Sequence, residues 1–186
     1  MKDAPSFEAI EHKVREIFVN TLQPESEVPG DQALIEELGF DSLDMIEFSF
    51  ALEEFFDLEF ASRNAIVELD RILGNDRVLH EGKLTPLGLQ VALERMPELR
   101  ETELPAELSV NSLPSYFTLH TFVRIIKESY DSAPEKCPET GEEAVIEDFK
   151  VVAKDSRQPI PMPAGDQILD RWLEARAAEL GTKSGG

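Results

Sequence analysis

The 186-residue sequence predicts an all-α fold in which one short extended segment precedes a C-terminal helix. Two observations support this class. Apolar residues recur at three- and four-residue steps along several segments, and helix-capping residues and Gly or Pro stops flank those segments. A third observation is the composition, because 41% hydrophobic and 30% charged residues suffice for a packed core and differ from the balance of a disordered chain.

The first predicted helix covers residues 7–22. Ser6 is suited to cap its N-terminus, and Pro24 ends it and opens a loop that runs to about residue 40. The buried stripe of this helix is predicted to contain Phe7, Ile10, Val14, Ile17, Phe18 and Leu22. A loop of this length needs apolar anchors on the core, and the expected anchors are Leu34, Ile35 and Leu38.

The second predicted helix covers residues 42–56. Asp41 can cap it through a side-chain oxygen, which leaves Ser42 in the first turn with an exposed hydroxyl. The residues expected in the core are Phe48, Leu52 and Phe56, whereas Phe50 is open between the core and a partner surface. An acidic face lies beside them, formed by Asp44, Glu47, Glu53 and Glu54.

Two further helices are predicted at about 62–73 and 85–96, and the second has the Thr85-Pro86 pair as its cap and first position. The stretch 100–114 is acidic, contains two prolines and predicts a loop. A strongly apolar helix over 118–129 should then close the core that the first two helices begin.

The composition changes after this helix. Residues 131–143 are rich in proline and glutamate, which is typical of a linker. Apolar pairs within 145–152 predict extended pieces, and the prolines within 159–163 impose a stiff extended segment. A final helix is predicted to be capped by Asp166 and to stop at Gly181.

The charge balance is strongly acidic, with 38 acidic and 18 basic residues and a formal net charge of −20. Nucleic acid and anionic membranes repel such a polyanion, whereas basic patches on partner proteins attract it. The single cysteine, Cys137, excludes an internal disulfide and favours a reducing compartment. No stretch resembles a signal peptide or a membrane span, so a cytoplasmic, soluble protein is expected.

The residues around Ser42 leave it few possible chemical roles. A hydrolase nucleophile elbow needs glycines two residues before and after the serine, and here Phe40 and Asp44 stand there. None of the three histidines belongs to a recognisable catalytic pattern, and the acidic residues around Ser42 lack the glycine-bent loop of a calcium site. A phosphodiester is physically sensible, because the first-turn amides and the helix dipole can offset its charge. No catalytic residue and no metal ligand is therefore predicted.

The segment 38–60, with the triplet Asp41-Ser42-Leu43, resembles the second helix of acyl carrier proteins and the loop that leads into it. The predicted helices at 7–22 and 118–129 take the places of the first and last helices of that family. The resemblance implies an acyl-carrier-like helical bundle. It also implies that Ser42 is the attachment residue for 4′-phosphopantetheine, which a phosphopantetheinyl transferase supplies from coenzyme A.

The resemblance further implies a function and its partners. The chain would hold acyl groups as thioesters on the arm and present them to acyl-loading and acyl-processing enzymes with basic docking patches, which agrees with the charge argument. The strongly acidic second helix favours the acyl branch over peptidyl carriers. The residues that match partner-recognition positions are Asp41, Leu43, Asp44, Glu47, Phe50, Glu53 and Glu54.

The sequence departs from ordinary members in two places. Extra helices are predicted within 61–113, between the second and last helices of a carrier-like domain over 1–130, and a C-terminal extension covers 131–186. The insertion is hypothesised to shield or enlarge an acyl-binding cavity. The terminal helix is expected to pack back onto the carrier core, with docking of a dedicated enzyme as the alternative.

Three functions remain open from the sequence alone. The first is a specialised, standalone and monomeric acyl carrier, for which the unusual length is an argument. The second is an unmodified carrier-like subunit with an interaction or regulatory role. The third is a peptidyl carrier. Fatty acid, polyketide and specialised lipid pathways are not distinguished.

Overall fold

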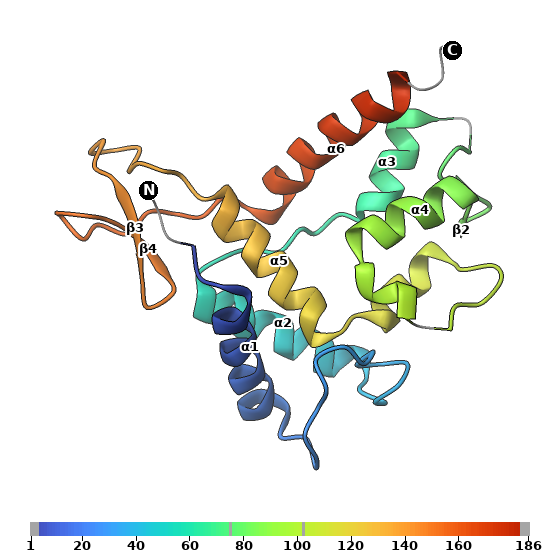
Figure 1. Ribbon diagram of the computed structural model, residues 1–186, viewed down its shortest axis with the longest axis horizontal. Helices are drawn as coiled ribbons and strands as arrows, with labels where there is room; N and C mark the ends of the chain where they lie inside the picture. The colour runs from blue at the N-terminus through green and yellow to red at the C-terminus, as the bar shows by residue number, and fades with distance from the viewer. Residues whose placement is uncertain (1–3, 75, 102, 183–186) are drawn as a thin grey trace.

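The structure is a computed structural model that describes residues 4–74, 76–101 and 103–182. The predicted all-α, acyl-carrier-like class is confirmed, because the described residues are mostly helical. Their short strands form two antiparallel hairpins, β1 with β2 and β3 with β4 (Figure 1). In chain order the elements are α1 (Phe7–Leu22), α2 (Ser42–Phe56), α3 (Ala65–Leu73), β1 (Leu79–His80), β2 (Lys83–Leu84), α4 (Pro86–Arg95), the 3₁₀ helices η1 (Pro97–Glu101) and η2 (Val110–Tyr116), α5 (Leu119–Ser132), β3 (Ala144–Glu147), β4 (Lys150–Ala153) and α6 (Gly165–Thr182). No helix among these described residues is long and apolar enough to cross a membrane.

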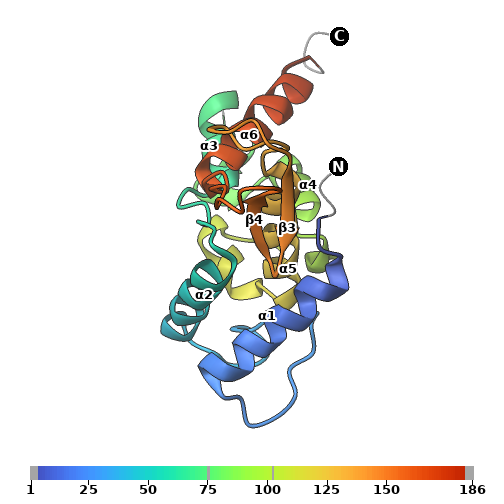
Figure 2. The same ribbon diagram turned by 90° about the vertical axis from the view of Figure 1, so that its left-hand side faces the viewer.

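A first hydrophobic core joins α1, α2 and α5, which lie side by side (Figure 2). Each helix contributes residues at three- and four-residue spacing, as expected for amphipathic helices that bury one face. The last of the three closes the core as predicted. The buried residues of the three helices in this first core are Ile10, Val14, Phe18, Phe48, Leu52, Phe56, Leu119, Phe122, Val123, Ile126 and Tyr130.

A second hydrophobic core joins two segments that are far apart in the sequence. Helices α3 and α6 lie against each other, and α4 and η2 complete the cluster (Figure 1). The terminal helix therefore buries Leu169, Leu173 and Leu180 against the insertion, whereas the sequence predicted packing onto the carrier core. The apolar faces of the insertion and of α6 have no partner close in the sequence, and in the folded chain they bury each other.

The start of α6 is attached to the segment that follows α2. The Gly165 amide donates a hydrogen bond of 2.7 Å to the Glu59 carbonyl oxygen. The Asp166 carboxylate accepts bonds from the Ser62 amide and hydroxyl, at 3.1 and 2.7 Å, and pairs with Arg63. Asp166 was predicted as the helix cap, but it lies in the first turn of α6 and turns its side chain toward residues 62–63. We call these contacts between residues 59–63 and 165–166 the clasp.

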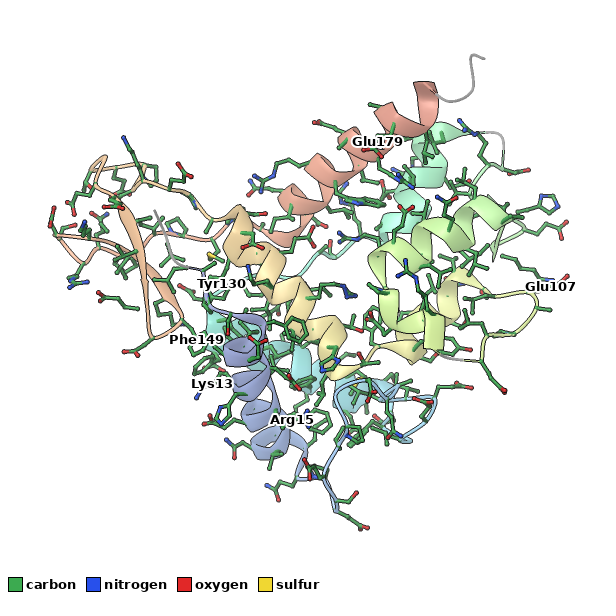
Figure 3. All side chains as sticks on the ribbon, in the orientation of Figure 1. Lys13, Arg15, Glu107, Tyr130, Phe149 and Glu179 are labelled. Carbon is green, nitrogen blue, oxygen red and sulfur yellow. The ribbon has the colours of Figure 1, made fainter. Side chains whose placement is uncertain are left out.

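The segment predicted as a linker folds against the first core. Ala133 and Cys137 are buried there, and the β3–β4 hairpin adds Ala144 and Val151. The Tyr130 hydroxyl, which Figure 3 labels on α5, donates a hydrogen bond of 2.5 Å to the Phe149 carbonyl oxygen at the hairpin turn. Composition alone indicated a linker, because prolines and glutamates separate the few apolar residues of this segment. The turns of the folded segment nevertheless bring these apolar residues against the first core.

The loop predicted over 100–114 is also different, because its last part forms the 3₁₀ helix η2. The Ser109 hydroxyl accepts a bond from the Asn111 amide and caps the helix. Val110, Leu113 and Tyr116 are spaced by three residues, so they share one face of a helix with three residues per turn, and all three are buried in the second core.

Ion pairs connect α5 with the insertion. Arg124 on α5 pairs with Glu98 of η1 at 3.0 Å, and Glu128 on α5 pairs with Arg95 of α4 at 3.0 Å. Burial lowers the pKa of Arg124. A cavity of about 180 Å³ lies between these charged groups. The contact between the two cores is thus partly polar.

Candidate functional site

Ser42 lies exposed at the first position of α2, where Asp41 organises the backbone. The Asp41 carboxylate accepts bonds from the amides of Leu43 and Asp44, at 2.7 and 3.0 Å. The Asp44 carboxylate accepts a bond of 2.8 Å from the Asp41 amide, which completes a capping box. The predicted cap is confirmed, and it fixes the start of the helix that presents the Ser42 hydroxyl.

The capping box changes one expectation about charge. The amides of Leu43 and Asp44 donate to Asp41, so they are not open to an anion as the sequence suggested. The positive end of the α2 dipole still favours negative charge close to Ser42. The structure therefore supports an exposed, fixed hydroxyl at this site and no amide cradle made by these two residues.

The loop before Ser42 is held by residues 115–117, which follow the insertion. Gly39 has a φ of +76°, a conformation that glycine adopts at no steric cost, and it allows the tight turn into α2. The amides of Leu34 and Glu36 donate to the carbonyl oxygens of Phe117 and Ser115, at 2.9 and 3.1 Å. Because Phe117 packs against both hydrophobic cores, the loop, the insertion and the first core meet beside the site.

The outer face of α2 carries exposed apolar and acidic side chains in one stripe. Leu43, Ile46 and Phe50 are 71%, 52% and 65% exposed, and Glu47 and Glu54 are exposed beside them. These positions are separated by three or four residues, so they fall on one side of the helix. We call Leu43, Ile46, Glu47, Phe50 and Glu54 the outer stripe.

The position of Phe50 answers the question left by the sequence, because its ring points away from the core that Phe48 and Leu52 fill. Ile46 was not among the predicted recognition residues. Its spacing of three residues from Leu43 and four from Phe50 is the signal that could have found it.

The remaining predicted recognition residues are engaged within the chain. Asp41 and Asp44 form the capping box. The Glu53 carboxylate accepts a bond of 2.7 Å from the Phe60 amide and so holds the segment that leaves α2. These three carboxylates shape the helix and its ends, whereas the outer stripe is directed to solvent.

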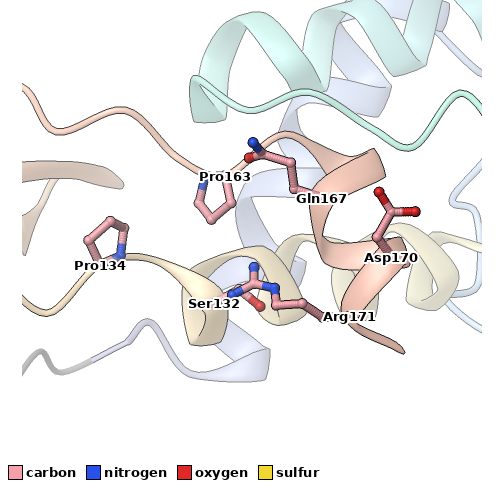
Figure 4. Close-up of a pocket in the computed structure, with 6 residues that line it drawn as sticks. All are labelled: Ser132, Pro134, Pro163, Gln167, Asp170 and Arg171. Atoms are coloured by element: carbon pink, nitrogen blue, oxygen red, sulfur yellow. The ribbon is translucent and has the colours of Figure 1, made fainter. Parts of the chain in front are cut away.

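Catalysis or metal binding at this site would need histidine, cysteine or acidic side chains in a suitable arrangement. His12 and His80 are exposed, and His120 lies 3.2 Å from Glu11. Within the described ranges, no group of three or more His, Cys, Asp or Glu side chains is arranged to hold a metal ion. A cavity lined by Ser132, Pro134, Pro163, Gln167, Asp170 and Arg171 lies where α5 ends and α6 begins, and α2 contributes no residue to it (Figure 4).

Comparison with known proteins decides the family. The family model described as the phosphopantetheine attachment site matches residues 12–71, a range that includes Ser42. An acyl carrier protein of Akkermansia muciniphila is 48% identical over 58 residues, which cover 31% of this chain and 72% of the relative. The chain belongs to the acyl carrier protein family. No solved structure matches it significantly.

The cofactor of this acyl carrier protein is covalently attached 4′-phosphopantetheine. The matched range begins within α1, includes all of α2 and ends within α3. The acidic excess of the chain is concentrated in the same part. In residues 1–60 the only basic residues besides His12 are Lys2, Lys13 and Arg15. An exposed hydroxyl on a capped helix, outside any catalytic arrangement, suits the attachment of such a group.

Proposed function

We propose that Ser42 carries the 4′-phosphopantetheine arm and that the chain is a specialised, standalone acyl carrier. The observation that carries this proposal is the exposed Ser42 hydroxyl at the head of α2, inside the range that matches the attachment-site family. Gly39 turns the preceding loop sharply, and a modifying enzyme can therefore approach the hydroxyl closely. A phosphopantetheinyl transferase that uses coenzyme A is the first partner in this proposal.

The role of Ser42 is that of an anchor. When bound, the prosthetic group supplies a flexible thiol that carries acyl groups as thioesters. Asp41 and Asp44 fix the first turn of α2, so the anchor keeps one place relative to the outer stripe. The ion-pair contacts of the two histidines His80 and His120 involve Asp76 and Glu11, and neither contact includes Ser42. We infer that the chain binds and presents its cargo and does not itself catalyse the reactions.

The partners in this proposal are acyl-loading and acyl-processing enzymes with basic docking patches. The outer stripe offers Leu43, Ile46 and Phe50 for apolar contact and Glu47 and Glu54 for lysine or arginine. Charge steers such encounters and the apolar side chains supply the contact area. The proposed location is the cytoplasm, which agrees with the lone Cys137, because disulfides are rare in that reducing compartment. The chain is proposed to act as a monomer.

Two other functions compete with this proposal. An unmodified interaction subunit would use the outer stripe without the arm. A peptidyl carrier would use the same arm for aminoacyl groups, but the acidic outer face of α2 favours the acyl branch.

The decisive experiment measures the intact mass of the chain after incubation with coenzyme A and a phosphopantetheinyl transferase. The wild type should gain one phosphopantetheinyl group, and Ser42→Ala should gain none. Ser49→Ala is the matched control, because Ser49 lies on the same helix and its hydroxyl donates to the Met45 carbonyl oxygen at 2.7 Å. It should be modified like the wild type. No mass gain with several transferases would favour the interaction subunit, and loading by aminoacyl enzymes only would favour the peptidyl carrier.

A further inference from the structure

Aromatic rings form a connected network within the first core of this protein, among its aliphatic side chains. Nine of the eleven phenylalanines, all of which lie within the described ranges, are buried in this core or packed against it. The exceptions are Phe7 and Phe50. Phe40, two residues before Ser42, packs against this core, so the apolar interior begins close to the proposed attachment residue.

The rings next to the attachment site interlock. Phe40 meets Phe18 edge to face at 5.1 Å between ring centroids, with the ring planes 78° apart. Phe18 meets Phe48 at 5.0 Å and 90°, and Phe48 meets Phe122 at 5.0 Å and 68°. Edge-to-face pairs at these distances are mutually attractive. A continuous row of rings thus crosses the interior from the loop before Ser42, through α1 and α2, to α5.

Two more rings close the sides of this row. Phe60 lies 6.1 Å from Phe122, and Phe117 lies 6.0 Å from it with the planes 89° apart. Phe60 lies just before the 61–113 insertion and Phe117 shortly after it, so the chain on both sides of the insertion places a ring against Phe122. Most apolar residues of the insertion pack in or against the second core, whereas Val67 and Ile72 are exposed.

The far end of the first core is closed as well. Helix α2 ends at Phe56, roughly 21 Å from Ser42 at the helical rise per residue. There Phe149, from the turn of the β3–β4 hairpin, meets Phe56 at 5.5 Å and Phe55 at 6.0 Å. The hydrogen bond from the Tyr130 hydroxyl to the Phe149 carbonyl oxygen fastens this turn, and Figure 3 shows both residues together beside α5.

A core built in this way resists a flexible chain. An aromatic side chain has two torsions, and in a close-packed interior it can move only if its neighbours move with it. Two cavities of the described residues lie elsewhere: one is lined mostly by charged groups of α4 and α5, and the other lies beside the start of α6. A long hydrocarbon chain that entered from Ser42 would have to displace several interlocked rings at once.

We propose that acyl groups on this protein stay outside the first core and that the protein does not bury long fatty acyl chains between its helices. The proposal rests on the proposed function at Ser42 and adds where the cargo lies. It replaces the hypothesis that the insertion enlarges an acyl-binding cavity, because the buried residues of the insertion pack in the second core and not in the first.

The experiment loads the full-length protein at Ser42 from butyryl-, octanoyl- and dodecanoyl-coenzyme A with a phosphopantetheinyl transferase, and confirms each product by intact mass. Thermal unfolding and the rate of thioester hydrolysis in mildly alkaline buffer are then compared. The Tm and the hydrolysis rate should each be the same for the three chain lengths, because an acyl chain in solvent neither stabilises the fold nor shields its thioester from water. A Tm that rises with chain length, together with slower hydrolysis of the dodecanoyl thioester, would overturn the proposal.

Two variants locate the cause. Phe122→Leu removes ring volume from the centre of the row, so its Tm and hydrolysis should become dependent on chain length. Phe7→Leu is the matched control, because Phe7 is a phenylalanine outside both the first core and the outer stripe, and it should behave like the wild type. A chain-length effect in the wild type that Phe50→Ala abolishes would place long cargo on the outer stripe and also overturn the proposal.

A failure of the proposed function is recognised separately, because Ser42 then gains no mass in any reaction. In that case dodecanoyl pantetheine is added to the unmodified protein. It should leave the Tm of the wild type unchanged and raise that of Phe122→Leu. A raised Tm of the wild type would refute the closed core whatever the state of Ser42.

Discussion

Replacing Gly165 with alanine sets two physical effects against each other. Alanine is the better helix former, and in a helix interior the exchange stabilises by about 0.5–1 kcal/mol. Gly165 begins α6, however, where the helix approaches the segment after α2. A Cβ atom at this position would lie 2.2 Å from the Ala61 nitrogen, 2.4 Å from the Phe60 carbonyl carbon and 2.6 Å from the Glu59 carbonyl oxygen.

These neighbours are backbone atoms and cannot rotate away, so the start of α6 must shift. Overpacking of this kind costs about 1–3 kcal/mol. The shift also weakens the 2.7 Å hydrogen bond from the Gly165 amide to Glu59, which contributes about 0.5–1.5 kcal/mol. We therefore expect Gly165→Ala to destabilise the protein by about 1–3 kcal/mol after the gain in helix propensity is subtracted. For a chain of this size Tm then falls by roughly 2–4 °C per kcal/mol.

The assay is urea unfolding followed by far-UV circular dichroism and by the fluorescence of Trp172. Trp172 is the single tryptophan of the chain and packs against the second core. Gly181→Ala is the matched control, because Gly181 lies in the same helix and a Cβ there would meet no atom within 4 Å. Its stability should be unchanged or slightly higher. If Gly165→Ala is as stable as Gly181→Ala, the close approach between α6 and residues 59–61 is wrong.

Two further predictions concern the helix starts. Asp41→Ala removes the acceptor for the amides of Leu43 and Asp44 and should lower the free energy of urea unfolding by about 1 kcal/mol. Asp41→Asn should stay close to the wild type, because asparagine is an equally good cap. Equal losses in both variants would contradict a capping role. The hydrogen bond from the Ser62 hydroxyl, followed by that from the Arg63 amide, keeps the pKa of Asp166 below its ordinary value of about 3.9. Because the folded state lowers this pKa, the contribution of Asp166 to stability is present above that ordinary value and is lost as the pH falls through the lower, folded one. The difference in urea midpoint between the wild type and Asp166→Asn should therefore be largest near neutral pH and shrink in acid, and a constant difference would refute the role of the charge in the clasp.

The elements around Ser42 could be predicted closely from the sequence because their signals are local. Ser6 and Asp41 cap α1 and α2 as expected, and the predicted bounds of both helices match the structure. The inward face of α2 was also predicted, since Phe48, Leu52 and Phe56 follow one another at four-residue steps. Phe50 stayed open because an aromatic residue on an acidic side fits either a core or a surface.

The remaining differences come from contacts between distant residues. Composition predicted a linker where Ala133 and Cys137 are buried, and a loop where η2 forms. The resemblance to acyl carrier proteins also placed Asp44 and Glu53 at partner-recognition positions, and in the structure both carboxylates accept hydrogen bonds from the backbone of their own chain. A carboxylate on a helix has the same sequence signature in either role, and only the position of the nearest amide separates the two.

The sequence by itself determined that this chain has a carrier helix with a serine at its head, because caps and apolar spacing act over a few residues. Only the tertiary structure decided which apolar faces meet. It joins α3 to α6 in a second core and places Phe149 over the end of α2. An apolar stripe in the sequence shows that a helix face must be buried, but it does not show which face will cover it. The hydrophobic effect is non-directional, so any complementary apolar face can bury the stripe.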